Sequence, residues 1–204
     1  MIKMVKVLGI LGSPRKGKSN DTLLDAALEK IKEDADIEKI YLVDYNIIPC
    51  NGCDTCVKKM ECPLDKNDDM KQLRDKLLDA DAIIIASPSY FGGPPGILKN
   101  FMDRSRPLKM AGHKLKNKVF GFISSSGLRY GAQHEVISAL MNFALIHGGI
   151  VVGAAGKVIE PNYAIGSFQG DKIKEFRKSS EDEIGLKTSE LLASHVIEIA
   201  KRIC

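Results

Sequence analysis

The chain has 204 residues, which suits one α/β domain with its own core and is too short for two ordinary domains. Hydrophobic residues at 44% and charged residues at 27% are typical of a globular protein. Thirty basic and 26 acidic side chains leave a formal charge of +4 without any run of like charge. This balance argues against nucleic-acid binding, although it could help to attract an acidic protein partner. Because the sequence has neither an apolar run of about 20 residues nor a signal cleavage site, we expect a cytoplasmic protein without a membrane span.

The first predicted strand runs from Met4 to Leu11, a nearly continuous apolar segment typical of a strand buried in a parallel sheet. A polar loop leads from it into a predicted helix. This loop lacks the glycine spacings of the common nucleotide-binding motifs. However, amides at a helix N-terminus, together with short hydroxyl and amide side chains, can bind an anion. We therefore expect a monophosphate site formed by Ser13, Arg15, Ser19, Asn20 and Thr22. The alternative is an ordinary solvated turn with a helix cap.

The second predicted strand, Ile37 to Val43, leads directly into a cysteine-rich loop. Four of the five cysteines fall within thirteen residues at the spacing C-x2-C-x2-C-x5-C. Three cysteines at successive x2 intervals suit three corners of an iron–sulfur cube, and a longer arm brings in the fourth. We therefore expect a cluster-binding loop insertion at residues 46–67, with a [4Fe-4S] cluster held by Cys50, Cys53, Cys56 and Cys62.

Other uses of these cysteines stay open. Zinc also binds four cysteines, but usually on two C-x2-C knuckles that are separated by a longer spacer. Disulfides would suit an oxidising compartment, and a single C-x2-C could be a redox dithiol, yet neither needs four thiols in one loop. We interpret Cys204 as a plain terminal thiol.

A helix opens at Asp68 and Asp69, which we interpret as helix caps. The clearest buried strand, Ala82 to Ala86, then leads into a rigid loop with two adjacent aromatic residues and a helix from Ile97 to Arg104. Doubly wound sheets bind ligands at such loops, although Tyr90 and Phe91 could instead be core residues. With its backbone amides and the flat apolar surface of Tyr90 and Phe91, this loop is a candidate ligand-binding loop.

The fourth predicted strand, Val119 to Ser124, is followed by another polar loop and a helix from Glu135 to His147. A fifth strand at Ile150 to Ala155, a polar excursion at 161–180 and a last helix complete the chain. Five strands that alternate with helices predict a single doubly wound domain over residues 1–204, with a parallel sheet in the order 2-1-3-4-5. Loops after strands 1, 3 and 4 then converge on one crevice for a phosphate and a planar ring.

Several segments resemble the flavodoxin-like NADPH-dependent FMN reductase superfamily: the phosphate loop, the loop at 87–91 and the helix at 99–104. The cysteine loop resembles that of the iron–sulfur flavoproteins of anaerobic archaea and bacteria. This resemblance extends to about Ala155. It implies a flavodoxin-like fold that binds FMN and a [4Fe-4S] cluster, in a homodimer or dimer of dimers where one subunit's cluster can serve its neighbour's flavin. It also implies that one side of the ring is lined by Pro88, Ser89, Tyr90, Phe91 and Gly92, and that the other side is closed by Ser125, Ser126, Gly127 and Tyr130.

The pair of cofactors implied by this resemblance predicts electron transfer. A ferredoxin-type carrier would reduce the cluster, the cluster would reduce FMN, and FMN would reduce an acceptor such as dioxygen or peroxide. Hydride donation by NAD(P)H, as in an FMN or quinone reductase, is the main alternative. A zinc-stapled, flavin-binding adaptor without turnover is an alternative of another class. The sequence identifies no acidic or nucleophilic partner for any of the four histidines. We therefore assign them structural roles and name no catalytic residue.

Overall fold

We analysed a computed structural model, which describes residues 4–170 and 172–203; Cys204 lies outside the described residues. The strands are β1 (Val5–Leu11), β2 (Ala35–Tyr41), β3 (Ala82–Pro88), β4 (Val119–Ser126), β5 (Ile150–Val151) and β6 (Ala164–Ser167). The α-helices are α1 (Ser19–Lys30), α2 (Thr55–Lys59), α3 (Met70–Asp79), α4 (Gly96–Arg104), α5 (Arg106–Met110), α6 (Gln133–Ile146) and α7 (Glu183–Ile203). Short 3₁₀ helices are η1 (Leu42–Asp44), η2 (Pro63–Lys66) and η3 (Ser179–Glu181).

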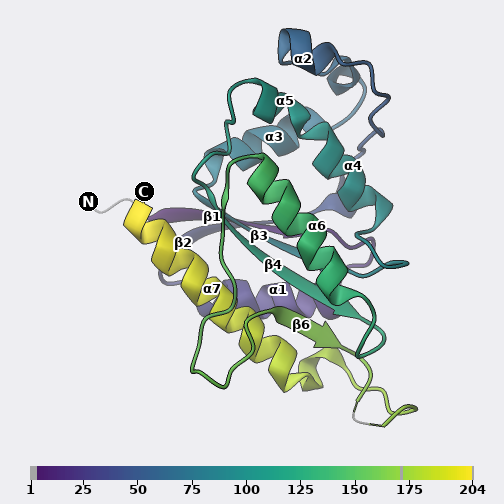
Figure 1. The fold of residues 1–204 in the computed structure, drawn as a ribbon, viewed down its shortest axis with the longest axis vertical. Coiled ribbons are helices and arrows are strands. Elements are labelled where there is room, and N and C mark those ends of the chain that lie inside the picture. The colour runs from purple at the N-terminus through teal and green to yellow at the C-terminus, as the bar shows by residue number, and fades with distance from the viewer. Residues whose placement is uncertain (1–3, 171, 204) are drawn as a thin grey trace.

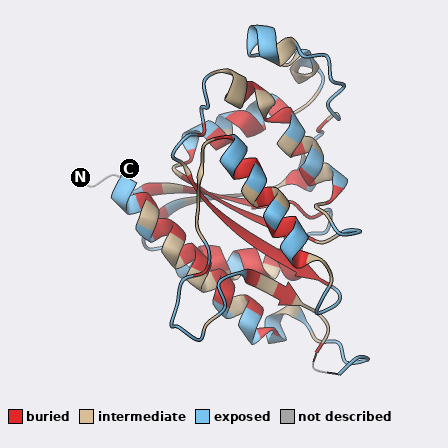
Figure 2. Cartoon of the chain, viewed as in Figure 1, coloured by how far each residue is buried: buried red, intermediate tan, exposed pale blue. Residues whose placement is uncertain are grey.

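All the strand pairs are parallel, and the order β2-β1-β3-β4-β5 confirms the predicted doubly wound topology. The two central strands, β3 and β4, are buried along their whole length (Figure 2). Their continuous apolar composition is explained by helices on both faces of the sheet, which leave no face of these strands to solvent.

The helices form two layers around the sheet (Figure 1). One core lies between the sheet and the helices α1 and α7, where Leu24 and Val196 are fully buried. The second core lies beneath α3, α4 and α6, where Leu73, Phe101 and Leu140 are fully buried. Short helix α2 projects beyond this second layer and contacts α5 (Figure 1). Among residues 4–170 and 172–203, no helix has both the length and the apolar composition that a membrane crossing requires.

The outer edge of β4 differs from the sequence expectation. The predicted fifth strand is only two residues long and pairs with Val119 and Phe120. Further along β4, Ile123–Ser126 pairs with β6, a strand within the region expected to be a polar excursion. Asp182 accepts hydrogen bonds from the amides of Ser167 (2.8 Å) and Gly185 (3.1 Å), which fastens the end of β6 to the start of α7. This region has few apolar residues, so the sequence did not predict its strand. The strand is held mainly by backbone and carboxylate hydrogen bonds.

Candidate functional site

Three loops meet at the carboxyl edge of the sheet because the strands that carry them are neighbours. Leu11 is paired with Ala86, and Pro88 is paired with Ser125, so β1, β3 and β4 end side by side. Backbone hydrogen bonds continue past the strand ends, from Gly12 N to Ala86 O (2.8 Å) and from Ser89 N to Ser125 O (3.0 Å). The sheet itself thus fixes the bases of the three loops that the sequence predicts to form a crevice.

The first loop leaves hydrogen-bond donors available at the start of α1. Ser13 Oγ accepts a hydrogen bond from Arg15 N (3.1 Å) and thereby fixes the turn. Lys18, at the N-cap, makes no side-chain capping hydrogen bond, so amides of the first turn can bind an anion. The buried Asn20 has an Oδ1 atom without a partner among the described residues. Rotation of this amide would place donor Nδ2 there, and an anion would satisfy it.

Two predicted phosphate residues already have protein partners. Ser19 Oγ accepts a hydrogen bond from Ser179 Oγ (2.7 Å), and Thr22 Oγ1 donates to Lys18 O (3.4 Å). The hydrogen bond between Ser19 and Ser179 joins α1 to η3, two elements that lie far apart in the sequence. Ser19 and Thr22 therefore also stabilise the loop itself, beyond any contact with a ligand.

A buried carboxylate, Asp21, lies in the same helical turn and would repel a phosphate if it were unpaired. Its oxygens accept hydrogen bonds from Gly17 N (2.6 Å) and from Lys39 Nζ. Burial alone would lower the pKa of Lys39, but its hydrogen bonds to Asp21 and Asp25 outweigh that effect and raise it. Lys39 therefore stays charged and neutralises Asp21, whose role is to shape the loop.

The second loop presents an exposed aromatic ring from a tight turn. Tyr90 N donates to Gly93 O (2.9 Å) and Gly93 N donates to Tyr90 O (3.1 Å), which leaves Phe91 and Gly92 as the two turn residues. Both have positive φ, 49° for Phe91 and 83° for Gly92. This conformation is ordinary for glycine and strained for phenylalanine. Phe91 is fully exposed and Tyr90 is 39% exposed, so neither is a core residue.

The third loop is organised by Gln133, a residue that the sequence interpretation missed. Its Nε2 donates to Leu128 O (3.0 Å) and Gly166 O (3.3 Å), and its Oε1 accepts from Gly131 N (2.8 Å). Tyr130, held on this loop, is 93% exposed. A polar residue at the start of a helix, directly after a glycine-bearing loop, was the signal available in the sequence.

The predicted flavin-binding residues fall into two groups by burial. Those at the strand ends and the start of α1 are buried or half-buried: Ser13, Ser19, Asn20, Thr22, Pro88, Ser89, Ser125 and Ser126. Those at the loop tips are exposed: Arg15, Tyr90, Phe91, Gly92, Gly127 and Tyr130. A rigid polar floor is thereby surrounded by exposed aromatic and basic side chains.

The cysteine loop has a different construction. Every residue from Pro49 to Pro63 is exposed or half-buried. The backbone reverses at Gly52, Asp54 and Met60, where φ lies between 55° and 70°. Arg106 Nη1 donates to Asp54 Oδ1 (2.7 Å), which ties the loop to α5. The path of the loop is thus set by three residues with a left-handed backbone conformation, and few contacts stabilise it.

Three of the four free thiols share one electrostatic neighbourhood. Burial raises the pKa of Cys56, Arg106 opposes this increase, and the neighbouring Cys62 and Cys50 raise the pKa further. Cys53 lies within hydrogen-bonding distance of Thr55 Oγ1 (3.3 Å), and this contact lowers its pKa. The loop therefore gathers several thiols around a common region, with Arg106 beside them.

The donor set of the cysteine loop, four free thiols, is the set that binds an iron–sulfur cluster. Within the described part of the chain, no three His, Cys, Asp or Glu side chains form a group that could hold one metal ion. Tetrahedral zinc needs all four sulfurs about 2.3 Å from one centre. A cluster instead binds its thiolates at separate corners, so they can lie farther apart. Four free thiols in one loop supply the type and number of ligands that such a cluster takes.

Asp68 fastens the base of the cysteine loop. Its side chain is fully buried, and its oxygens accept hydrogen bonds from Ile48 N (3.0 Å), Met70 N (3.1 Å) and Arg104 Nη1 (2.5 Å). Burial alone would raise the pKa of Asp68, but the Arg104 and backbone hydrogen bonds outweigh it and lower that pKa. The interpretation as helix caps was correct for Asp68, which accepts from the Met70 amide, but Asp69 at the N-cap makes no side-chain capping hydrogen bond, and the ion pair was missed. The sequence signal for this ion pair was an arginine on the apolar face of α4, three residues after Phe101.

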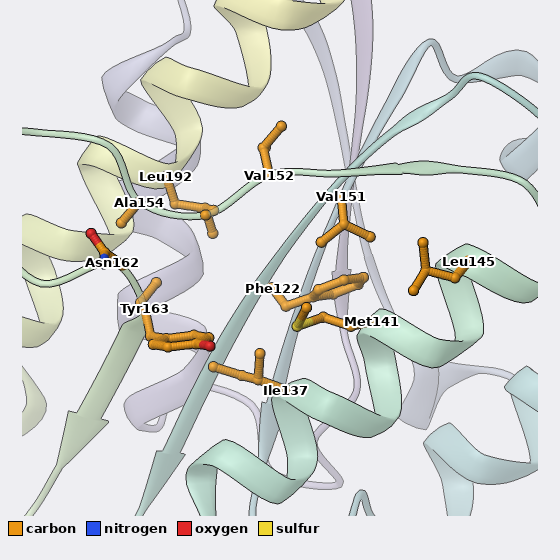
Figure 3. Close-up of a pocket in the computed structure, with 12 residues that line it drawn as sticks. Phe122, Ile137, Met141, Leu145, Val151, Val152, Ala154, Asn162, Tyr163 and Leu192 are labelled. Atoms are coloured by element: carbon orange, nitrogen blue, oxygen red, sulfur yellow. The ribbon is translucent and has the colours of Figure 1, made fainter.

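A separate apolar pocket of about 340 Å³ lies at the sheet edge where β5 ends and β6 has not begun (Figure 3). Phe122, Met141 and Tyr163 point into it from β4, α6 and the segment before β6. None of its lining residues belongs to the three crevice loops. The pocket is therefore a feature of the split edge strand and is distinct from the candidate site.

Comparisons with known proteins agree with this arrangement. The family described as NADPH-dependent FMN reductase matches residues 5–161. An iron–sulfur flavoprotein from Methanocaldococcus jannaschii is 39% identical over 98% of this chain and 99% of its own length. Another, from Methanosarcina thermophila, is 34% identical over 98% of this chain and 94% of its own. The chain belongs to the iron–sulfur flavoproteins of the NADPH-dependent FMN reductase family. The family resemblance predicted from the sequence is thus confirmed.

Solved structures support the fold assignment. RosB with bound 8-demethyl-8-formylriboflavin-5'-phosphate superposes with a TM-score of 0.71 at 17% identity, over 98% of this chain and 80% of that chain. A WrbA-like flavodoxin from Agrobacterium tumefaciens superposes with a TM-score of 0.62 at 21% identity, over 98% and 99%. At these identities the likeness shows a shared flavodoxin-like fold.

Proposed function

We propose that this member of the family binds FMN in the crevice and a [4Fe-4S] cluster on the cysteine loop, and that it transfers electrons from a one-electron carrier to an acceptor such as dioxygen or peroxide. The observation that carries this proposal is that four free thiols lie on one loop of a flavodoxin-like domain. When bound, a cluster exchanges single electrons and FMN exchanges one or two, so the pair supplies conversion between the two kinds of carrier.

The first loop would hold the FMN phosphate. Ser13 shapes the turn, the first amides of α1 and the side chain of Asn20 supply donors, and Arg15 adds a positive charge. Lys39 keeps Asp21 from repelling the phosphate. The isoalloxazine ring would lie across the ends of β3 and β4, where Tyr90, Phe91 and Tyr130 are exposed.

The position of the cysteine loop supports a homodimer. The loop contacts α5 and projects from the outer helical layer, whereas the crevice opens at the strand ends (Figure 1). Phe91 and Tyr130 also remain uncovered in one subunit. A second copy would cover these rings and could bring its own cysteine loop to the flavin, in a dimer or a dimer of dimers.

Two alternative functions receive less support. A zinc-stapled adaptor would need a compact four-sulfur group around one ion, and the described thiols do not form one. A reductase that uses only NAD(P)H and FMN would not need the cysteine loop at all. Because the matching family is described as NADPH-dependent, hydride donation by NAD(P)H is the competing source of electrons.

Anaerobic rapid mixing tests the order of electron transfer. The protein would be mixed with reduced ferredoxin or with NADPH, and cluster and flavin absorbance followed separately. We expect ferredoxin to bleach the cluster first and the flavin afterwards, and NADPH to act slowly or not at all. A Cys56→Ser control should lose flavin reduction by ferredoxin while dithionite still reduces the flavin. Fast flavin reduction by NADPH with an unchanged cluster would contradict the proposal.

A further inference from the structure

Both stems of the cysteine loop converge on one buried guanidinium. Arg104, 1% exposed, donates through Nη1 to Ile48 O (2.6 Å), two residues before Cys50. It donates through Nη2 to Asp65 Oδ1 (3.1 Å), three residues after Cys62. The incoming and outgoing ends of the loop are thus clamped together on α4.

The charges around Arg104 are balanced. Asp68 contacts both Nη atoms of Arg104 (2.5 and 3.2 Å), and Asp65 is shared between Arg104 and Arg74. Two arginines and two aspartates leave no net charge in this network. Any effect of Arg104 on the cysteine loop must therefore come from directed N–H groups and from loop position, because the network has no net charge to act at a distance.

One N–H of this guanidinium is unused. Nε of Arg104 is buried and has no hydrogen-bond partner among residues 4–170 and 172–203. A buried donor without an acceptor is unfavourable, so an acceptor is expected nearby. Cys62 is also close enough to the guanidinium to raise the pKa of Arg104, and it lies three residues before Asp65, which Arg104 holds. A ligating thiolate at Cys62 would supply that acceptor.

We propose that Arg104 is a positioning residue that clamps the loop and donates an N–H to the Cys62 sulfur, so that the reduced state of the cluster is favoured. Each electron from the carrier adds one negative charge at the loop, with no bond broken and no proton required. Hydrogen bonds to cluster sulfurs stabilise that added charge and raise the reduction potential. This inference rests on the proposed cluster.

Arg74 provides a matched control. It is also buried, and it donates to the same Asp65 and to Arg104 O (3.2 Å). None of its hydrogen bonds among the described residues reaches a thiol. Changing Arg74 thus disturbs the ion network while it leaves the N–H donor of Arg104 in place.

The test is an EPR-monitored redox titration of Arg104→Lys and Arg74→Lys beside the wild type, with iron and sulfide content measured. Lysine keeps the charge and loses the forked donors. We expect Arg104→Lys to lower the ratio of reduced to oxidised cluster at a fixed potential by about three- to tenfold, tenfold being 59 mV for one electron. Arg74→Lys should change it by less than about twofold. Equal shifts in both variants, or an unshifted Arg104→Lys with full iron, would overturn the inference.

A second measurement keeps Arg104 in place, so it can be made even if the Arg104→Lys variant loses its cluster. Arg106→Lys protein would be labelled with ¹⁵N-arginine and its reduced cluster examined by pulsed EPR. The labelled Arg104 should give a ¹⁵N coupling, and its absence would also overturn the inference. Wild-type protein without iron and sulfide would instead contradict the proposed function itself, so the two failures are distinguishable.

Discussion

The crevice loops and the cysteine loop lie on one domain but are stabilised in different ways. The crevice loops extend directly from paired strands, and their polar floor, including Ser13 and Ser125, is buried. The cysteine loop has no buried residue from Pro49 to Pro63, and its order depends on a clamp at its two stems. The comparison indicates that the proposed flavin site would be formed by the fold, whereas the proposed cluster site would be completed by its ligand.

The largest expected effect comes from removing one thiol ligand. Cys56→Ser should lose essentially all iron and sulfide, because the proposed cluster takes all four of its ligands from this one loop. The flavin content should stay near that of the wild type, since the cysteine loop is hydrogen-bonded to α5 and, among the described residues, no hydrogen bond joins it to the crevice loops. Metal and flavin analysis of the purified variant would check this, with Cys204→Ser as the control. Parallel loss of flavin would show that the two regions are not independent.

Breaking the clamp should cost more stability than breaking a surface pair. Asp68→Asn removes a fully buried carboxylate from Arg104 and should lower the free energy of unfolding by about 3 kcal/mol. Asp103→Asn, which breaks the exposed pair with Lys99, should cost less than about 0.5 kcal/mol. Urea unfolding of both variants would measure the difference. Similar values for the two would mean that the buried clamp stabilises little.

Acid should weaken the helical layer beneath the cysteine loop. His147 is buried against Ser105, the residue after Arg104 (2.8 Å), and burial, with Lys109 and His113 nearby, lowers its pKa to about 4. The unfolded chain would take up this proton near pH 6.5, so stability should fall as the pH drops from about 6.5 to about 4. The expected loss at pH 5 is about 2 kcal/mol.

The matched variants separate this effect from general acid sensitivity. His147→Gln should flatten the slope of unfolding free energy against pH between about 4 and 6.5, because the titrating group is gone. His134→Gln, at an exposed position, should leave that slope unchanged. Equal slopes in the wild type and His147→Gln would contradict the assignment.

The smallest expected effect concerns the strained tip of the crevice. Phe91→Gly should leave the flavin-free fold as stable or stabilise it by up to about 1 kcal/mol, because glycine tolerates φ of 49°. The same change should weaken FMN binding several-fold by removing a ring that would cover the flavin. Thermal unfolding of flavin-free protein and FMN titration would measure both. A destabilised fold with unchanged FMN affinity would mean that Phe91 has a structural role instead.

The alternation of strands and helices predicted the sheet order, because β1, β3 and β4 each contain a mainly apolar run and each is followed by a polar loop. The cysteine spacing identified the candidate cluster loop, and the family assignment agrees with it. The sequence could not indicate β6, which has few apolar anchors and depends on Asp182. It also could not show that Asp65 and Asp68 pair with Arg104, because Arg104 lies 39 and 36 residues further along the chain and only folding brings the charges together.

The most direct test of the account is cofactor analysis of anaerobically purified wild-type protein. Because the cysteine loop is proposed to hold a cube of iron and sulfide, and the crevice one flavin, we expect about four iron, four sulfide and one FMN per chain. One zinc per chain without sulfide, or flavin alone, would contradict the electron-transfer function.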